Sequence, residues 1–174
     1  MLGGVILSIA SGIIYIILKK QPLWKIADIS APSFVLGIGI TRLGCFLNGC
    51  CFGEPTASFL GIVFPSDCAA GFTFSNVPLH PTQLFSSFKG FFIFFILLFL
   101  ERYKKFDGFT FWLMLMLFSA GRFIIDFFRY YEPSMRISVL GVTWSVNQVI
   151  SVFIFILSGV MLYILSKGKL SNSN

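Results

Sequence analysis

Charged residues are scarce in this chain: Asp, Glu, Lys and Arg make up 11% of its 174 residues, whereas soluble domains carry roughly 25%. Hydrophobic residues make up 56%, with 23 phenylalanines among them, and the mean hydropathy is +0.88. A water-soluble fold of this composition would expose large apolar patches. The composition therefore excludes an ordinary soluble enzyme, a disordered chain and a small disulfide-stapled secreted domain. It leaves a multi-span membrane protein.

Two further absences narrow the function. The net charge is +6, but the basic residues form no run of the kind that binds nucleic acid, so we expect no nucleic-acid partner. The four cysteines include no C-x-x-C pair, which argues against a zinc ribbon and a thioredoxin-type redox motif. We expect no cofactor and no bound metal.

Long apolar runs fill most of the chain. A membrane-spanning helix needs about 20 mostly apolar residues, and five segments are candidates: residues 1–18, 26–51, 81–100, 109–128 and 142–165. Lysines follow the first run rather than precede it, unlike in a signal peptide, so we expect a retained span. The sequence predicts an all-α, polytopic membrane helix bundle that forms one transmembrane domain over residues 1–174.

The basic residues gather in alternate connections between the predicted spans. They are Lys19, Lys20 and Lys25 after the first span, Arg102, Lys104 and Lys105 after the third, and Lys167 and Lys169 after the fifth. The long loop over residues 54–80 contains no Lys or Arg. The positive-inside rule therefore predicts that the N-terminus and this loop lie outside and that the C-terminus lies inside.

Several charged residues lie within the predicted spans, where each costs about 2.5–3.5 kcal/mol and usually marks a function. Arg122, Asp126 and Arg129 lie at i, i+4 and i+7, on one helix face, and Arg42 lies in the outer half of the second span. An Arg122–Asp126 pair still leaves an excess of about two positive charges, which an external anion would compensate. The planar guanidinium group can form two parallel hydrogen bonds to a phosphate. We therefore predict that the compensating anion is the phosphate of a phospholipid headgroup. We expect Lys89 to extend to the membrane surface; alternatively, it adds to this positive field.

The second predicted span ends in turn-forming residues. The segment over residues 41–56 contains Asn48, Gly49 and Gly53, and irregular backbone at membrane depth is tolerated only inside the protein or beside a cavity. The glycines either allow close helix packing or present backbone N–H groups beside Arg42 to an anion.

His80 is the only histidine in the chain and begins the His-Pro-Thr-Gln sequence that opens the third span. It is either a hydrogen-bonded spacer or a proton acceptor near the arginines, since imidazole titrates near physiological pH. Gln83 and Asn48 either orient a ligand through hydrogen bonds or join neighbouring helices.

The four cysteines, Cys45, Cys50, Cys51 and Cys68, allow three interpretations. We expect small, buried, apolar side chains. A disulfide from Cys68 to Cys50 or Cys51 is an alternative, because compartments outside the cell allow disulfides. A zinc site that adds His80 to the last three cysteines is disfavoured, because adjacent cysteines are an unusual ligand pair.

Three segments, in order, resemble motifs of the prolipoprotein diacylglyceryl transferase family. They are R-L-G-C-F-L-N-G-C-C-F-G (42–53), L-H-P-T-Q-L-F (79–85) and G-R-F-I-I-D-F-F-R (121–129). The resemblance covers most of the chain and implies a multi-pass enzyme of lipoprotein maturation in the bacterial cytoplasmic (inner) membrane. Such enzymes transfer diacylglyceryl from phosphatidylglycerol to the thiol of a lipobox cysteine in a prolipoprotein signal peptide, and glycerol phosphate leaves.

The resemblance also implies roles for individual residues. Arg42 and Arg122 would hold the headgroup phosphate and stabilise its departure, with Arg129 assisting. The remaining lipid-binding candidates are Asn48, Gly49, Gly53, Gln83 and Asp126. His80 is the candidate general base; alternatively, the acceptor thiol ionises without a protein base.

The chain departs from the family pattern at several positions. Family members are longer, with further N-terminal spans that carry a functional Tyr, and Leu2 stands where the family has a catalytic His before a Gly pair. Cys45 replaces an Asn of the family, and Cys50 and Asp126 each replace a Glu. Two other functions therefore stay open: a non-catalytic protein of the same fold that binds anionic phospholipid, and a membrane thiol oxidoreductase.

Overall fold

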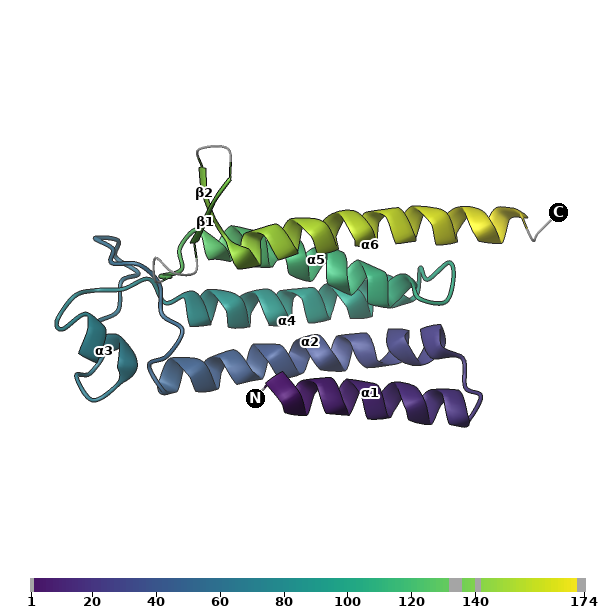
Figure 1. Ribbon diagram of the computed structural model, residues 1–174, viewed down its shortest axis with the longest axis horizontal. Helices are drawn as coiled ribbons and strands as arrows, with labels where there is room; N and C mark the ends of the chain where they lie inside the picture. The colour runs from purple at the N-terminus through teal and green to yellow at the C-terminus, as the bar shows by residue number, and fades with distance from the viewer. Residues whose placement is uncertain (1, 132–135, 140–141, 172–174) are drawn as a thin grey trace.

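The computed structural model describes residues 2–131, 136–139 and 142–171. Its elements, in chain order, are α1 (Leu2–Leu18), α2 (Leu23–Leu47), α3 (Ala69–Thr73), α4 (Thr82–Glu101), α5 (Phe109–Asp126), β1 (Arg136–Val139), β2 (Val142–Ser145) and α6 (Val146–Ser171). The long helices run side by side along one axis (Figure 1). Within the described residues, α2, α4, α5 and α6 are long and apolar enough to span a membrane. The predicted membrane helix bundle is confirmed.

The first predicted span is also helical, as α1, and covers about 26 Å at 1.5 Å per residue. It packs against α2, while α2, α4 and α5 pack on one another and α6 packs mainly on α5. The predicted count of five spans thus corresponds to four long helices and one shorter one.

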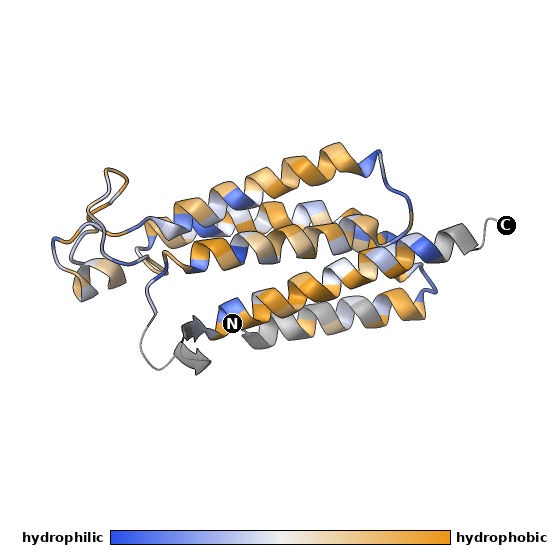
Figure 2. Ribbon diagram, turned by 90° about the horizontal axis from the view of Figure 1, so that it is seen from above, coloured by the Kyte–Doolittle hydropathy of each residue, from blue (hydrophilic) through white to orange (hydrophobic). Residues whose placement is uncertain are grey.

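The connections of the bundle separate by charge. The α1–α2 and α4–α5 connections and the end of α6 lie together at one end, which we call the basic end (Figure 1). Residues 54–80, with α3, lie at the opposite end, which we call the loop end. Hydrophilic residues concentrate toward the ends, and hydrophobic residues cover most of the helices between them (Figure 2). This is the arrangement that the positive-inside rule requires if the loop end is outside.

Two predicted helix ends are wrong by a few residues. The second span was expected to reach residue 51, but α2 ends at Leu47, because Asn48 is its C-cap and Gly49 has a left-handed φ of +61°. The fourth span was expected to reach residue 128, but α5 ends at Asp126, and Phe127 is its C-cap.

The start predicted for the last span is also wrong. Residues 142–145 were expected to be helical, but they form β2, which pairs antiparallel with β1. α6 begins only at Val146, because Ser145 and Gln148 cap it reciprocally. The Gln148 N–H donates to Ser145 Oγ (3.1 Å), and the Ser145 N–H donates to Gln148 Oε1 (2.9 Å). This Ser-x-x-Gln pattern is a capping box.

Small residues allow α2 and α4 to approach each other closely next to the bundle's apolar core. A Cβ built on Gly90 of α4 would lie 2.9 Å from the Cα of Gly39 in α2, and Ser87 Oγ donates to the Gly39 carbonyl (2.7 Å). Small residues at a helix interface in a membrane allow this close backbone approach. The adjoining core consists of Ala31, Val35, Ile93, Leu97 and Met114.

We expect Gly90→Ala to lower the free energy of unfolding by about 1–3 kcal/mol, because the added methyl overpacks the α2–α4 contact. Gly37→Ala is the matched control, since a Cβ at Gly37 in α2 meets nothing within 4 Å. The measurement is the thermal unfolding midpoint of both variants in the same detergent. Equal midpoints for the two alanine variants would contradict the close contact.

Candidate functional site

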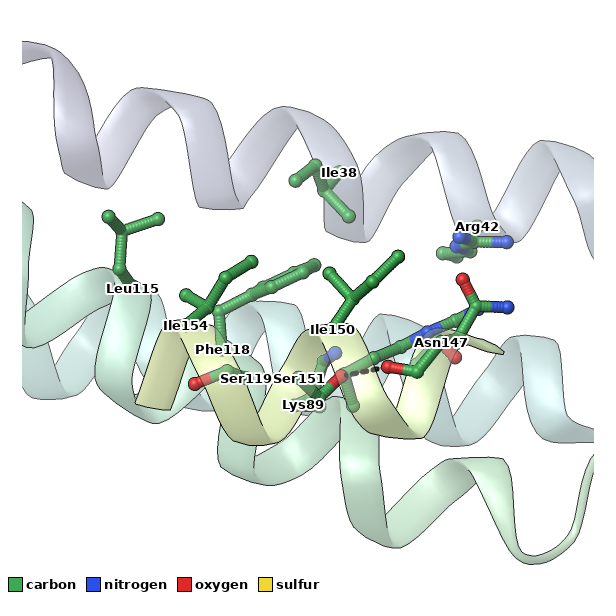
Figure 3. A pocket seen from close by; sticks show the side chains of 12 residues that line it. Ile38, Arg42, Lys89, Leu115, Phe118, Ser119, Asn147, Ile150, Ser151 and Ile154 are labelled. Carbon is green, nitrogen blue, oxygen red and sulfur yellow. Dashed lines mark hydrogen bonds between the residues drawn. The ribbon is translucent and has the colours of Figure 1, made fainter. Parts of the chain in front are cut away.

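A cavity of about 190 Å³ lies between α2, α4, α5 and α6, in the half of the bundle toward the loop end. Three cations line it, each from a different helix: Arg42, Lys89 and Arg122. Among the residues that the structure describes, no acidic side chain lines it. Figure 3 shows Arg42 and Asn147 at one end of the cavity and Leu115 and Ile154 toward the other. The cavity is therefore cationic and polar at one end and apolar at the other.

Arg42 makes neither an ion pair nor a side-chain hydrogen bond with any residue that the structure describes. Lys89 was expected to extend to the membrane surface, which is wrong: its Nζ lies 3.8 Å from the centre of the Phe118 ring, inside the cavity wall. Its side chain passes over Gly121, where a Cβ would overlap the Lys89 stem. A glycine on α5 thus admits a lysine from α4 into the interior.

Arg122 belongs to a hydrogen-bonded group at the same end. Its Nη2 lies 3.7 Å from Asp126 Oδ1 and donates to the Tyr131 hydroxyl (3.2 Å). The Tyr131 hydroxyl donates to Asp126 Oδ1 (2.5 Å) and accepts from Asn147 Nδ2 (3.0 Å). The expected Arg122–Asp126 ion pair is therefore present, but Asp126 is shared with Tyr131 and with Ser145, whose hydroxyl donates to its second oxygen.

Tyr131 and Ser145 are site residues that the sequence analysis missed. Burial, and the hydrogen bond to Asp126, raise the pKa of Tyr131, so its hydroxyl stays a neutral donor at neutral pH. The Ser-x-x-Gln pattern could have indicated Ser145, because it marks a helix N-terminus. No local sequence pattern marks Tyr131 as a site residue, because it lies beyond the end of α5 and contacts Arg122 only when the chain folds back.

Arg129 does not line the main cavity. It lies in a second hollow of about 130 Å³ with Glu54, Asp126 and Tyr131, and its guanidinium carbon is 5.4 Å from the centre of the Tyr131 ring. Arg122 and Arg129 therefore approach Tyr131 from two different hollows.

Asn48 and Gly49 also lie apart from Arg122. They line a third hollow, of about 560 Å³, between the end of α2 and the loop over residues 54–80, which contributes Phe64 and Cys68. Asn48 is exposed, and a Cβ on Gly49 would overlap Cys68 Sγ. Gly49 is needed there for its left-handed backbone and for space.

The three segments that carry the family resemblance meet at the loop end. The Gly53 N–H donates to the His80 carbonyl, and the Glu54 N–H donates to the Phe128 carbonyl, both at 3.0 Å. A Cβ on Gly53 would lie 2.5 Å from the Phe128 carbonyl oxygen and 2.7 Å from His80 Cβ. The N–H of Gly53 is thus engaged by the protein backbone, which leaves Gly53 a role in shaping this crossing.

His80 does not line the cavity of the arginines. Its ring packs edge-on against Phe128, with 5.4 Å between ring centres, and its buried Nδ1 has no hydrogen-bond partner among the described residues. The next residues of its motif fix the turn after α2. Thr82 Oγ1 donates to the Cys51 carbonyl (3.0 Å), and Gln83 Nε2 donates to the Cys50 carbonyl (2.8 Å).

The four cysteines are free thiols in the structure, so the alternative disulfide from Cys68 is not formed. Cys68 Sγ donates to the Pro65 carbonyl (3.1 Å). Burial raises the pKa of the Cys50 thiol, which makes it a weak nucleophile at neutral pH. This argues against a thiol oxidoreductase that relies on Cys50.

Known proteins match this chain over most of its length. A model of the prolipoprotein diacylglyceryl transferase family matches residues 1–164. Phosphatidylglycerol–prolipoprotein diacylglyceryl transferase 2 of Clostridium perfringens is 38% identical over 95% of this chain and 62% of its own length. The corresponding transferases of Clostridium tetani and Geobacter sulfurreducens are 36% and 33% identical, over 89% and 96% of this chain and 59% and 61% of their own lengths.

This chain thus spans about six tenths of the length of these relatives. The family match includes all three motif segments, whose backbones meet at Gly53, His80 and Phe128. The chain belongs to the prolipoprotein diacylglyceryl transferase family.

Proposed function

We propose that the cavity binds phosphatidylglycerol, and that the protein transfers its diacylglyceryl group to the lipobox cysteine of a prolipoprotein at the bacterial cytoplasmic membrane. The observation that carries this proposal is a set of three cations around one cavity, Arg42, Lys89 and Arg122, with no acid among the described residues of its wall. Asp126 pairs with Arg122, but Arg42 and Lys89 have no acidic partner among the described residues, and uncompensated cations away from water are costly. A bound phosphate would offset that cost.

The shape of the cavity supports a lipid rather than a small soluble anion. Its cationic end lies toward the loop end, and apolar side chains such as Leu115, Phe118 and Ile154 line the remainder. Ile150 of α6 also lines the cavity and is 49% exposed, so the cavity is not sealed along this helix. A headgroup at the arginines would thereby leave its acyl chains a route to the bilayer.

The reaction requires little more from the protein than this charge. The acceptor thiolate attacks the glycerol carbon that carries the phosphate, a C–S bond forms, and the C–O bond breaks. The electron pair of the C–O bond leaves with glycerol phosphate, and the cations stabilise the developing charge. Because His80 lies outside the cavity wall, we propose that the acceptor thiol ionises in the field of the cations, which lowers a thiol pKa.

The test uses the purified chain in phosphatidylglycerol vesicles with a synthetic lipobox peptide. We expect the peptide to gain the mass of one diacylglyceryl group on its cysteine and glycerol phosphate to appear in equal amount, both measured by mass spectrometry. A peptide with serine in place of that cysteine is the matched control and stays unmodified. Lipid binding without any peptide adduct would refute the transferase and favour a non-catalytic lipid-binding protein.

A further inference from the structure

Three cysteine thiols meet where α2 ends. The Sγ atoms of Cys45, Cys50 and Cys51 all lie within 4.8 Å of one another, and no disulfide joins them. Neither Cys68 nor His80 belongs to this cluster, nor does any described carboxylate. The group is therefore a set of sulfur ligands only, different from the set that the sequence analysis weighed.

Buried hydrogen bonds fix the backbone that carries the cluster. The Cys50 N–H donates to the Cys45 carbonyl (3.1 Å), and the buried side chains of Thr82 and Gln83 hold the Cys51 and Cys50 carbonyls. Cys51 has a φ of +61°, which is uncommon for a residue with a side chain and persists only where its surroundings enforce it. In this turn two adjacent thiols converge, which removes the objection to adjacent cysteines as ligands.

We infer that Cys45, Cys50 and Cys51 bind one thiophilic metal ion, Zn(II) or Cu(I). Thiolate-only sites select these ions over harder cations. Tetrahedral ligands at a Zn–S distance of about 2.3 Å place their sulfur atoms about 3.8 Å apart, so shifts of about 1 Å from the present separations complete the site.

The surrounding charge suits this site. Three thiolates and a divalent ion sum to one negative charge. Arg42 precedes Cys45 by three residues on α2, which places the two on the same helix face, and Arg42 has no acidic partner among the described residues. The cluster therefore lies one helical turn from a cation that would compensate the charge of the metal-loaded form.

Three protein ligands leave a fourth position of a tetrahedral ion open, as in catalytic zinc sites. A thiol that coordinates a bound cation is deprotonated. A cysteine thiol that takes this position would release its proton to solvent, in addition to the effect of the cavity's cations on its pKa. This consequence rests on the proposed transferase function, whereas the metal site does not.

The test measures metal binding by the reduced chain of residues 1–174 in detergent. We expect one Zn(II) per chain, or one Cu(I) under anaerobic conditions, by elemental analysis after gel filtration. Co(II), as a spectroscopic probe, should give thiolate-to-cobalt charge-transfer absorption. Cys45→Ser and Cys50→Ser should each weaken binding by more than about tenfold, since even changes beyond the direct ligands have effects of that size.

Cys68→Ser is the matched control, because Cys68 lies outside the cluster and binds the Pro65 carbonyl; its metal content should equal that of the unaltered chain. Circular dichroism checks that every variant keeps its helices. A metal-free unaltered chain, or unchanged cobalt absorption in Cys45→Ser, overturns the site. Transfer is assayed on the same preparations, so that loss of transfer with intact metal binding counts against the transferase proposal alone.

Discussion

Arg42→Ala is expected to lower the rate of diacylglyceryl transfer by at least about a hundredfold, since removing one donor from a developing oxyanion has an effect of that order. Arg42 lines the cavity and makes no ion pair within the described residues. Its removal therefore leaves no buried partner unsatisfied and lessens the repulsion among the cavity's cations. The stability of the fold should stay the same or rise slightly while the transfer rate falls.

The measurement is the initial rate of peptide modification in phosphatidylglycerol vesicles, with thermal unfolding followed in parallel. Arg42→Lys should recover part of the rate, because lysine keeps the charge but loses the bidentate fork. Arg102→Ala is the control: Arg102 lies at the basic end, over the Phe99 ring, and its loss should leave the rate unchanged. Transfer by Arg42→Ala at the unaltered rate would refute the phosphate site.

Arg122→Ala should also lower the transfer rate strongly, but its effects on phosphate binding and on folding cannot be separated. Arg122 lines the cavity and also donates to the Tyr131 hydroxyl. Its loss would remove a cation and disturb the hydrogen bonds that converge on Asp126. We therefore expect a lower unfolding midpoint as well as a lower rate, and Arg42 remains the cleaner probe of phosphate binding.

The helix bundle, and the difference in charge between its two ends, were predictable because the order of apolar and basic residues determines them directly. Apolar runs of spanning length and the alternation of basic connections are properties of the sequence itself. The start of α6 was not predictable from hydropathy, since residues 142–145 are uncharged and continuous with the apolar run of α6 but form a strand. A short apolar run does not distinguish the two structures; the cap formed by Ser145 and Gln148 does.

The positions of site residues could be predicted from the sequence only for residues that lie within regular helices. Arg42 and Arg122 come from α2 and α5 and line one cavity, whereas their role in binding phosphate stays a prediction. The i, i+7 argument failed for Arg129 because α5 ends at Asp126, so Arg129 leaves the helix face. The position of Lys89 depends on Gly121 of a neighbouring helix, a contact that no local pattern encodes.

Asp28 gives the second large effect, on stability rather than on transfer. It is 3% exposed, and it reaches from α2 across to the start of α5 at the basic end. Its two oxygens accept from the Gly108 N–H (2.7 Å) and the Phe111 N–H (2.9 Å), and Lys104 Nζ lies 2.8 Å away. One carboxylate from α2 thus caps α5 and pairs with Lys104 of the α4–α5 connection. We expect Asp28→Ala to lower the free energy of unfolding by about 1–3 kcal/mol for each of the two N–H donors left without an acceptor; Lys104 keeps its second partner, Asp107.

Asp28→Asn separates the charge from the hydrogen bonds. The amide keeps one acceptor oxygen for the helix N-terminus but loses the ion pair and the second acceptor, so its effect should lie between those of alanine and the unaltered chain. The hydrogen bond to Asp28 raises the pKa of Lys104 above its ordinary value of 10.5. The stabilisation by this pair is therefore fully present at neutral pH and is lost only as the pH rises through the raised pKa of Lys104. Unfolding midpoints of Asp28→Asn and the unaltered chain should differ by a constant amount from neutral pH to about 10 and then converge. A difference that already shrinks near neutral pH would show that Lys104 is not the partner that stabilises Asp28.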